Sequence, residues 1–298
     1  MFKQSTLALV GLALMAIMVG AATAGARAWD DTKYPDLKGQ WRRVGNGGLL
    51  AGGAGGLRWD DSLPAKNTPS LGQEPPLTPE YQAIYDANLA DMTEGGQGID
   101  PTYNCVSPGM PRVMIGYSRL EIVVTPAITY ILMDRDHDHF RHIYTDGREF
   151  PANMEENPLF LGYSIGTWLD TTGSGRFDTL EVETRGLKGP RVFDATGIPL
   201  HADNETVIKE RIYLDKANAD LLHDDITTID HALTRPWTVL RPYGREHQPI
   251  FAEFVCAEDN HHFMVGNETY FRSVDGLLMP TRKDQPPPLL RGFDQPGK

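Results

Sequence analysis

Short runs in which apolar and polar residues alternate fill the second half of this chain. The alternation is clear at Phe177, Leu180 and Val182, and turn signals such as Asp146-Gly147 separate one run from the next. Because no strand–helix–strand rhythm appears, the pattern favours an antiparallel sheet over a doubly wound one. The sequence therefore predicts a mainly β protein, built as a single antiparallel β-barrel or curved meander. The candidate strands are 120–125, 128–133, 139–145, 176–184, 206–214, 221–229, 237–241 and 249–256.

One or two helices are expected at the periphery of the barrel. Thr78-Pro79-Glu80 predicts a helix start, with a capping hydroxyl and a proline in the first turn. Apolar residues then follow at helical spacing as far as Met92. A second, short helix is predicted over 267–274, where Asn267 can cap the first turn.

Two segments are typical of irregular structure. Residues 45–79 are rich in glycine and proline, and the tail over 283–298 is rich in proline. The glycines of 45–56 are not followed by Gly-Lys-Ser/Thr, so this stretch is not a phosphate-binding P-loop. We expect a loop or lid there instead.

The first 28 residues have the three-part layout of a secretory signal peptide. Lys3 precedes an apolar run over 7–19, and small residues follow, with cleavage options after Ala26 and Ala28. The apolar run is shorter than the roughly 20 residues that span a bilayer. We therefore expect residues 1–28 to be removed on export, which leaves a periplasmic or secreted protein with one β-rich domain over 29–298.

The charge balance excludes some classes of partner. The chain carries 28 Lys and Arg against 40 Asp and Glu, a net charge of −12, whereas nucleic-acid binding needs clustered cations. A hydrophobic content of 40% and a charged content of 23% also exclude a disordered or multi-span membrane chain. We expect no nucleic-acid partner and no stable membrane insertion after the signal peptide is cleaved.

A set of motifs resembles a family of exported, largely uncharacterised bacterial β-rich proteins. The resemblance implies an exported β-rich fold, and the Gly39-Gln40-Trp41 step is similar to the first strand of lipocalin-like barrels. The set covers about residues 105–260 and is specific only as a whole. Its members are CVSPGMPR (105–112), IYTDGR (143–148), GYSIG (162–166) with Trp168, DTLEVET (178–184), Glu210-Arg211, RPWTV (235–239) and VCAEDN (255–260).

The two cysteines, Cys105 and Cys256, both lie inside these motifs, which supports treating them as a pair. An oxidising compartment allows them to form a disulfide. Closing so long a loop would stabilise the fold by about 4 kcal/mol or more. Two separate buried thiols are the alternative, and a zinc site is disfavoured because neither cysteine has a second cysteine nearby.

A His-x-His pair, His137 and His139, is a candidate zinc site. On a strand the two imidazoles would share one face, and a neighbouring strand would have to supply a third ligand. The candidates for that ligand are His261, His262, Glu258 and His231. Because no third ligand can be located, a solvated, charge-rich hairpin end is the favoured interpretation.

For two further motifs, a structural role is favoured over a catalytic or metal-binding role. Gly162 to Gly166 matches G-x-S-x-G, but a turn rather than a helix follows, so a glycine-flanked bend between strands is favoured over a serine nucleophile. Asp170, Asp178 and Glu181 fall at the first, ninth and twelfth positions of a calcium-loop pattern. Two of the usual carboxylates are missing there, so a polar hairpin loop is favoured over a calcium site.

Charged residues inside the family-like motifs are candidates for acid/base chemistry. Arg112 and Arg148 could hold carboxylates, while Glu258, Glu210 and Asp146 could act as acid or base if they are buried in a barrel mouth. A structural ion-pair network is the alternative. Aromatic residues near the motifs could line a cavity for a flat, apolar ligand. The candidates are Tyr144, Tyr163, Trp168 and Trp237.

Three functional classes remain open. The first is an enzyme of the hydrolase or lyase type that binds a small apolar or aromatic molecule in the barrel and transforms it by acid/base chemistry. The second is a non-catalytic carrier of such a molecule, and the third is a zinc-dependent hydrolase or lyase that uses His137 and His139. The density of Arg, Asp and Glu in the motifs favours the first class. No cofactor is required by the sequence, and zinc and calcium are the metals considered.

Overall fold

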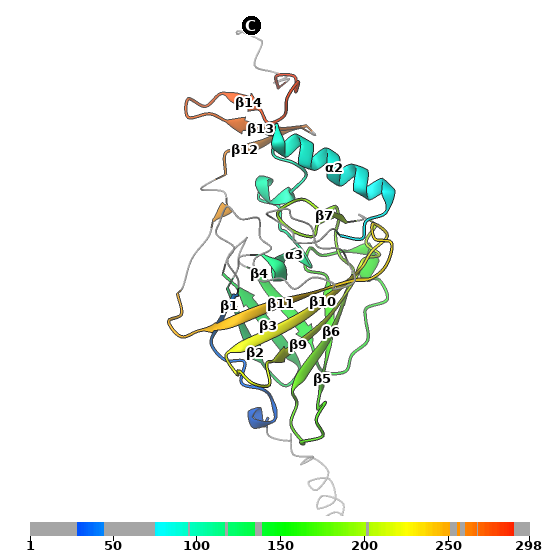
Figure 1. Cartoon of the computed structure of the whole chain (residues 1–298), viewed down its shortest axis with the longest axis vertical. Coiled ribbons are helices and arrows are strands. Elements are labelled where there is room, and N and C mark those ends of the chain that lie inside the picture. The colour runs from blue at the N-terminus through cyan, green and yellow to red at the C-terminus, as the bar shows by residue number, and fades with distance from the viewer. Residues whose placement is uncertain are drawn as a thin grey trace, which may run out of the picture. The chain divides into compact units, whose positions relative to one another are not determined.

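The alternating runs form a closed barrel of nine strands in the computed structural model of this protein (Figure 1). The strand order is β1-β11-β10-β9-β6-β5-β4-β3-β2, and β2 pairs with β1 to close the ring. Neighbouring strands are antiparallel except for β4 and β5, which run parallel. The predicted mainly β barrel is therefore confirmed. Its strands are β1 (Gln40–Arg43), β2 (Leu120–Val124), β3 (Ile128–Met133), β4 (His139–Tyr144), β5 (Tyr163–Leu169), β6 (Thr179–Arg185), β9 (Val207–Leu214), β10 (Leu221–Ile229) and β11 (Trp237–Glu246).

The structure describes residues 29–44, 75–94, 96–116, 119–134, 139–200, 203–250, 255–256, 260–266 and 268–288. The chain divides into two compact units, Met1–Lys33 and Tyr34–Lys298, and the second holds the barrel. In the first unit the described residues form a short 3-10 helix, η1 (Asp31–Lys33). The predicted signal peptide (1–28) and most of the glycine- and proline-rich segment lie outside the described residues.

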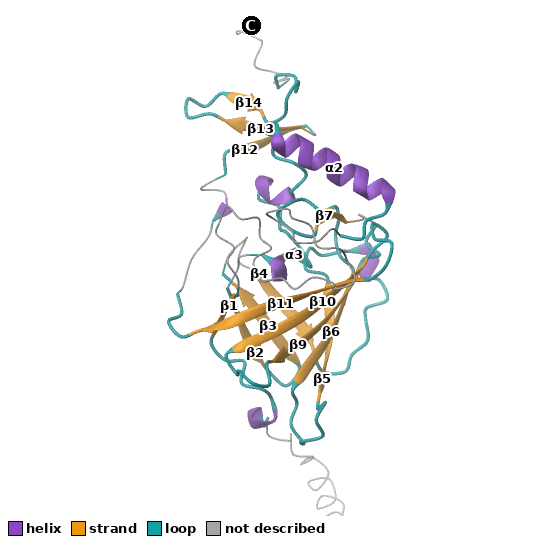
Figure 2. Ribbon diagram, in the orientation of Figure 1, coloured by secondary structure: helices purple, strands orange, loops and turns teal. Residues whose placement is uncertain are grey.

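Among the described residues of the second unit, helices α2 and α3 and two small sheets accompany the barrel (Figure 2). Short 3-10 turns connect some of these elements. The helices are α2 (Pro79–Thr93) and α3 (Arg112–Ile115), and the 3-10 turns are η2 (Pro101–Asn104) and η3 (Met154–Glu156). One small sheet pairs β7 (Arg191–Val192) with β8 (Pro199–Leu200), and the other has the order β12 (His262–Val265), β13 (Glu268–Arg272), β14 (Leu278–Pro280).

Besides α3 and the small strands β7, β8, β12 and β14, which the sequence did not predict, the predicted elements differ from the observed ones in three places. The helix predicted over 267–274 is wrong, because Thr269, Tyr270 and Phe271 form strand β13 and pair with β12 and β14. These residue types favour a strand, which outweighs the capping signal. Strand β5 was not predicted. Of the strand predicted over 249–256, residues 249 and 250 lie outside any strand and 251–254 lie outside the described residues.

Helix α2 begins at Pro79, as the sequence predicts, and packs on the segment around β8. Proline at the first turn suits a helix start because its missing N–H has no partner there in any case. The Thr78 hydroxyl, however, makes no capping hydrogen bond. The helix is held instead by Tyr85, whose hydroxyl lies 2.9 Å from the Thr196 hydroxyl, and by Asn88, which donates to the Thr196 carbonyl at 2.8 Å.

Two large side chains are buried on the adjacent strands β1 and β11, which pair with each other. Trp41 on β1 and Trp237 on β11 are both 0% exposed. The Trp41 indole donates to the Leu37 carbonyl at 3.0 Å, and Trp237 lies against Phe193 with ring centroids 4.3 Å apart. The Gly-x-Trp step of the sequence thus contributes a buried Trp on the first strand. Burial of each large apolar side chain stabilises the fold by about 2–3 kcal/mol.

A disulfide joins Cys105 to Cys256, which confirms the predicted pair. The Cα atoms lie 5.7 Å apart across a sequence separation of 151 residues. Cys105 ends η2 with a positive φ of 55°. The bond therefore links the segment that leads into α3 with the segment that follows β11.

Candidate functional site

A buried network of charged and hydroxyl groups crosses the interior of the barrel. Arg141 on β4 reaches Glu210 on β9 with two contacts, of which Nη1 to Oε1 is 2.7 Å. Its Nη2 also donates to the Thr184 hydroxyl at 3.0 Å, and Ser164 lies 2.8 Å from Thr184. Arg141 and Glu210 are 1% and 2% exposed. Such a bidentate pair in a dry interior fixes both side chains.

The Ser164 contacts explain the G-x-S-x-G motif. Ser164 is the second residue of β5, faces inward and takes part in this network, so it lies on a strand and neither on a strand-to-helix elbow nor in the expected bend between strands. Gly162 has φ +67°, and an added Cβ there would lie 2.7 Å from the Arg185 carbonyl oxygen. At Gly166 an added Cβ would lie 2.6 Å from the Ile143 side chain on the parallel partner strand. The two glycines therefore allow β5 to enter the barrel beside β4.

A wedge opens in the barrel wall where β4 and β5 separate. The two strands pair only at Ile143 with Ser164 and at Tyr144 with Ile165. The backbone before β5 turns away from β4, since Leu159 bonds to Gly186 and Lys188, and the Phe160 carbonyl accepts from Met110. Gly109 permits this approach, because a Cβ there would lie 2.7 Å from the Phe160 carbonyl oxygen.

This wedge holds a cavity of about 300 Å³, which we call the wedge pocket. Apolar side chains dominate it, and two of them are unusually exposed, Phe140 at 61% and Leu159 at 55%. Arg141 is also among the lining residues, but its guanidinium points to the barrel interior, on the face of β4 opposite Phe140 and His142. Three of the motifs noted in the sequence meet here. The pocket is lined by Ser107, Phe140, Arg141, His142, Tyr144, Leu159, Phe160, Leu161, Gly162 and Tyr163.

Two of the predicted ligand-binding aromatics belong to the pocket, and two do not. Tyr144 and Tyr163 stack with ring centroids 4.8 Å apart. By contrast, Trp168 donates to the Thr129 hydroxyl at 3.3 Å and is 9% exposed, while Trp237 is fully buried. Both tryptophans are part of the core, where alternation on β5 and β11 points them inward.

An exposed ion pair flanks the stacked tyrosines. The Arg148 guanidinium lies 3.9 Å from the centre of the Tyr144 ring and binds both carboxylate oxygens of Asp146. The hydrogen bonds from Arg148 lower the pKa of Asp146. The Asp146-Gly147 turn thus holds a cation on one face of the Tyr144 ring, which attracts it through its negative face.

The predicted acid/base set is spread over separate places and does not form one site. Arg112 pairs with Asp100, which also binds the Thr102 backbone N–H and hydroxyl. Asp146 and Arg148 pair with each other on a turn, and Glu210 is bound to Arg141 inside the barrel. Glu258 lies outside the described residues. The structural ion-pair interpretation therefore holds for these pairs.

The residues of the predicted zinc site are only partly described. Residues 135–138, His137 among them, lie outside the described part of the chain, and His139 is described by its backbone, which opens β4 opposite Met133. Strands β3 and β4, on either side of this segment, pair antiparallel. His261 and His262 lie in a different sheet, where both imidazoles contact the Phe271 ring.

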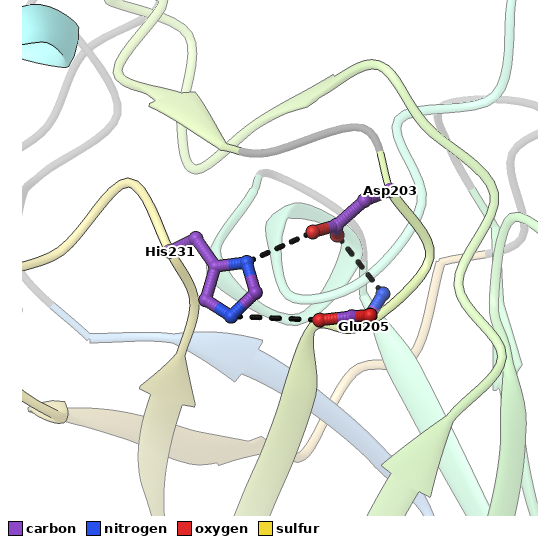
Figure 3. Close-up of side chains that lie close together, drawn as sticks. All are labelled: Asp203, Glu205 and His231. Atoms are coloured by element: carbon purple, nitrogen blue, oxygen red, sulfur yellow. Dashed lines mark hydrogen bonds and ion pairs between the residues drawn. The ribbon is translucent and has the colours of Figure 1, made fainter.

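Among the described residues, one group of three potential metal ligands gathers: Asp203, Glu205 and His231 (Figure 3). His231 Nδ1 lies 2.9 Å from Asp203 and Nε2 lies 3.5 Å from Glu205. The imidazole is 62% exposed, and each ring nitrogen already faces a carboxylate. The group is accounted for as an exposed ion-pair cluster.

The calcium-loop residues serve the hairpin between β5 and β6. Asp170 accepts the backbone N–H groups of Ser174 and Gly175 at 3.0 and 2.7 Å. Asp178 accepts from Thr171, and Glu181 faces outward on β6 and pairs with Arg211 at 3.4 Å. The three carboxylates are therefore engaged in hydrogen bonds and an ion pair of the hairpin, in agreement with the polar-hairpin interpretation.

A larger groove of about 580 Å³ lies on the outer wall across β5, β6, β9, β10 and β11. Its charged side chains pair across adjacent strands at directly opposed positions, such as Glu181 with Arg211 and Glu183 with Lys209. Such pairs stabilise a sheet surface and leave few groups for a ligand. We therefore place the candidate site at the smaller, more apolar wedge pocket.

Sequence reasoning missed the most unusual group of the barrel interior, Asp224 on β10. Its side chain is 0% exposed, and neither carboxylate oxygen has a hydrogen-bond partner within the described part of the chain. Burial and the neighbouring Glu210 raise the pKa of Asp224 well above its usual value. The alternation of the predicted strand over 221–229 was the available signal, because it puts Asp224 on the same face as Leu222 and Ile226.

Neither a protein-family model nor a curated protein matches this chain. Within the described residues, no helix combines the length and apolar character that a membrane crossing requires.

Proposed function

We propose that this protein binds a small, flat, apolar or aromatic molecule in the wedge pocket. The observation that carries the proposal is the exposure of Phe140 and Leu159 at one concave site. Apolar side chains exposed together in a cavity are typical of ligand sites, whereas single exposed ones are common on any surface. At about 300 Å³ the cavity is at the small end of the range for organic ligands.

The pocket wall suits a planar ligand. The stacked rings of Tyr144 and Tyr163 stand beside it, and aromatic rings pair well with a further flat ring. Ser107 and His142 supply polar groups at its edge, which would orient a ligand that carries one or two polar atoms. A compact aromatic molecule fits this lining better than a long-chain lipid.

The signal-peptide pattern and the disulfide support a periplasmic or secreted location for this binding protein. A disulfide of this kind is typical of an oxidising compartment. Acid/base catalysis is the second candidate function. It is favoured by the buried Glu210 and Asp224, which lie behind the Arg141 that borders the pocket.

The test uses the neutral fluorescent probe N-phenyl-1-naphthylamine and two matched variants. Leu159→Arg places a charge in the wedge pocket, whereas Leu277→Arg makes the same change at a leucine that is 60% exposed elsewhere. We expect saturable binding to the wild type, at least tenfold weaker binding to Leu159→Arg and unchanged binding to Leu277→Arg. Equal affinities for the two variants would show that the probe binds elsewhere and would overturn the proposal.

A further inference from the structure

The interior of the barrel carries a second carboxyl group beside the Arg141–Glu210 pair. Asp224 faces inward on β10, directly opposite Arg241 on β11 in the strand register. Glu210 faces inward on β9, where it stands opposite Ile226, so Asp224 and Glu210 are diagonal neighbours on adjacent strands. Diagonal neighbours on one face of a sheet are within reach of long side chains.

The two arginines of this cluster, Arg141 and Arg241, make different contacts. The Arg141 guanidinium is held by Glu210, Thr184 and Ser164. Arg241 is directed along the barrel, where its Nη2 donates to the Ile115 carbonyl of α3. Burial lowers the pKa of Arg241 to about 10, so this group stays a cation at neutral pH. The cluster thus holds two guanidinium groups and two carboxyl groups, all almost fully buried.

The charges around Asp224 act in opposite directions. Burial, Glu210 on β9 and Asp225 on β10 raise the pKa of Asp224, whereas Arg141 on β4 and Arg241 on β11 lower it. The remaining titratable neighbour, Tyr243 on β11, donates its hydroxyl to the Met114 carbonyl, and burial raises the pKa of that phenol. Burial favours the neutral acid, yet both cations stabilise the carboxylate once the proton has left.

We infer that Asp224 is the proton-carrying group of a buried acid/base centre, in which Arg141 is paired with Glu210 and Arg241 compensates the charge when Asp224 releases its proton. In that step the O–H bond of the Asp224 carboxyl breaks, its electron pair stays on the oxygen and the proton passes to solvent water. No redox partner is needed. The neutral form fits the absence of a bound donor at either oxygen among the described residues.

This centre is coupled to the wedge pocket through Arg141, a step that rests on the proposed function. Arg141 borders the pocket and also acts on the charge of Asp224. A ligand that shifts the Arg141 guanidinium therefore changes the proton affinity of Asp224. By linkage, the proton on Asp224 changes the ligand affinity by the same factor.

The first experiment follows the carboxyl ¹³C resonances of aspartate in the full chain as the pH changes. Asp224→Asn identifies the resonance, and Asp275→Asn, at an exposed turn, is the control. We expect one aspartate to remain protonated at neutral pH, and its resonance to be lost only in Asp224→Asn. If every aspartate of the wild type is ionised at neutral pH, the inference is overturned whether or not Asp224→Asn folds.

The second experiment measures N-phenyl-1-naphthylamine affinity between about pH 5 and 9 in the wild type and both variants. We expect a change of about fivefold or more in the wild type and in Asp275→Asn, and a flat profile in Asp224→Asn. Probe binding with a flat wild-type profile would overturn the coupling and leave the binding function standing. Failure of the probe to bind would overturn the proposed function, while the carboxyl titration would still decide the state of Asp224.

Discussion

Breaking the buried Arg141–Glu210 pair by Glu210→Gln should destabilise the fold strongly. The substitution keeps the shape of the side chain but leaves the guanidinium of Arg141, which is 1% exposed, without its carboxylate. An uncompensated buried charge typically costs about 3–5 kcal/mol. With a urea m-value of about 3 kcal/mol/M, the unfolding midpoint should fall by roughly 1–1.7 M.

The structure also predicts what should rescue this loss. In the double variant Arg141→Met/Glu210→Leu both charges are gone, and Ser164 and Thr184 keep each other as partners at 2.8 Å. Replacing a whole buried pair by apolar groups of similar size is often close to neutral. We therefore expect the double variant to lie within about 1 kcal/mol of the wild type.

The assay is urea unfolding of the disulfide-intact protein, followed by tryptophan fluorescence, for the wild type, Glu210→Gln, the singles Arg141→Met and Glu210→Leu, and the double variant. The loss of stability in Glu210→Gln should depend on pH, because Asp224 can ionise and replace the lost negative charge beside Arg141. The loss in Glu210→Gln should then be smaller at alkaline than at acidic pH. A loss below about 1 kcal/mol, or a double variant as unstable as the singles, would refute the assigned role of the pair.

Three further predictions concern stability. Asp224→Asn should stabilise the protein increasingly as the pH rises above about 4. Because the pKa of Asp224 is raised in the folded state, the folded wild type holds a proton that the unfolded chain has lost, so the wild type loses stability as the pH increases and the variant does not. Melting temperatures of both proteins across this range check the prediction, and a difference independent of pH would contradict it. Cys105→Ser should lower the free energy of unfolding by about 4–5 kcal/mol, and dithiothreitol should then have no further effect on its urea midpoint. Gly162→Ala should cost several kcal/mol more than Gly173→Ala, since both have φ near +68° but only Gly162 has no room for a Cβ; equal urea midpoints would rule out the steric argument.

The wedge pocket could be predicted only in part. The motifs pointed to Tyr144 and Tyr163, and both residues line the pocket. The sequence did not indicate that Phe140 and Leu159 would be exposed together, because that depends on where β4 and β5 separate. The strands separate because Leu159 hydrogen-bonds to Gly186 and Phe160 hydrogen-bonds to Met110. Both partners are distant from the start of β5 along the chain.

Local chemistry determined the β class, the turns and the start of α2, because alternation with period two and the fixed φ of proline act within a few residues. Closure of the barrel, the parallel β4–β5 pair and the Arg141–Glu210 bridge join residues that are tens to hundreds of positions apart, so only the tertiary structure decided them. The proton affinity of a buried acid is likewise decided by the tertiary structure. The sequence shows that Asp224 is an acid at an inward-facing position of a strand, but its proton affinity depends on burial and on four groups brought from β4, β9, β10 and β11.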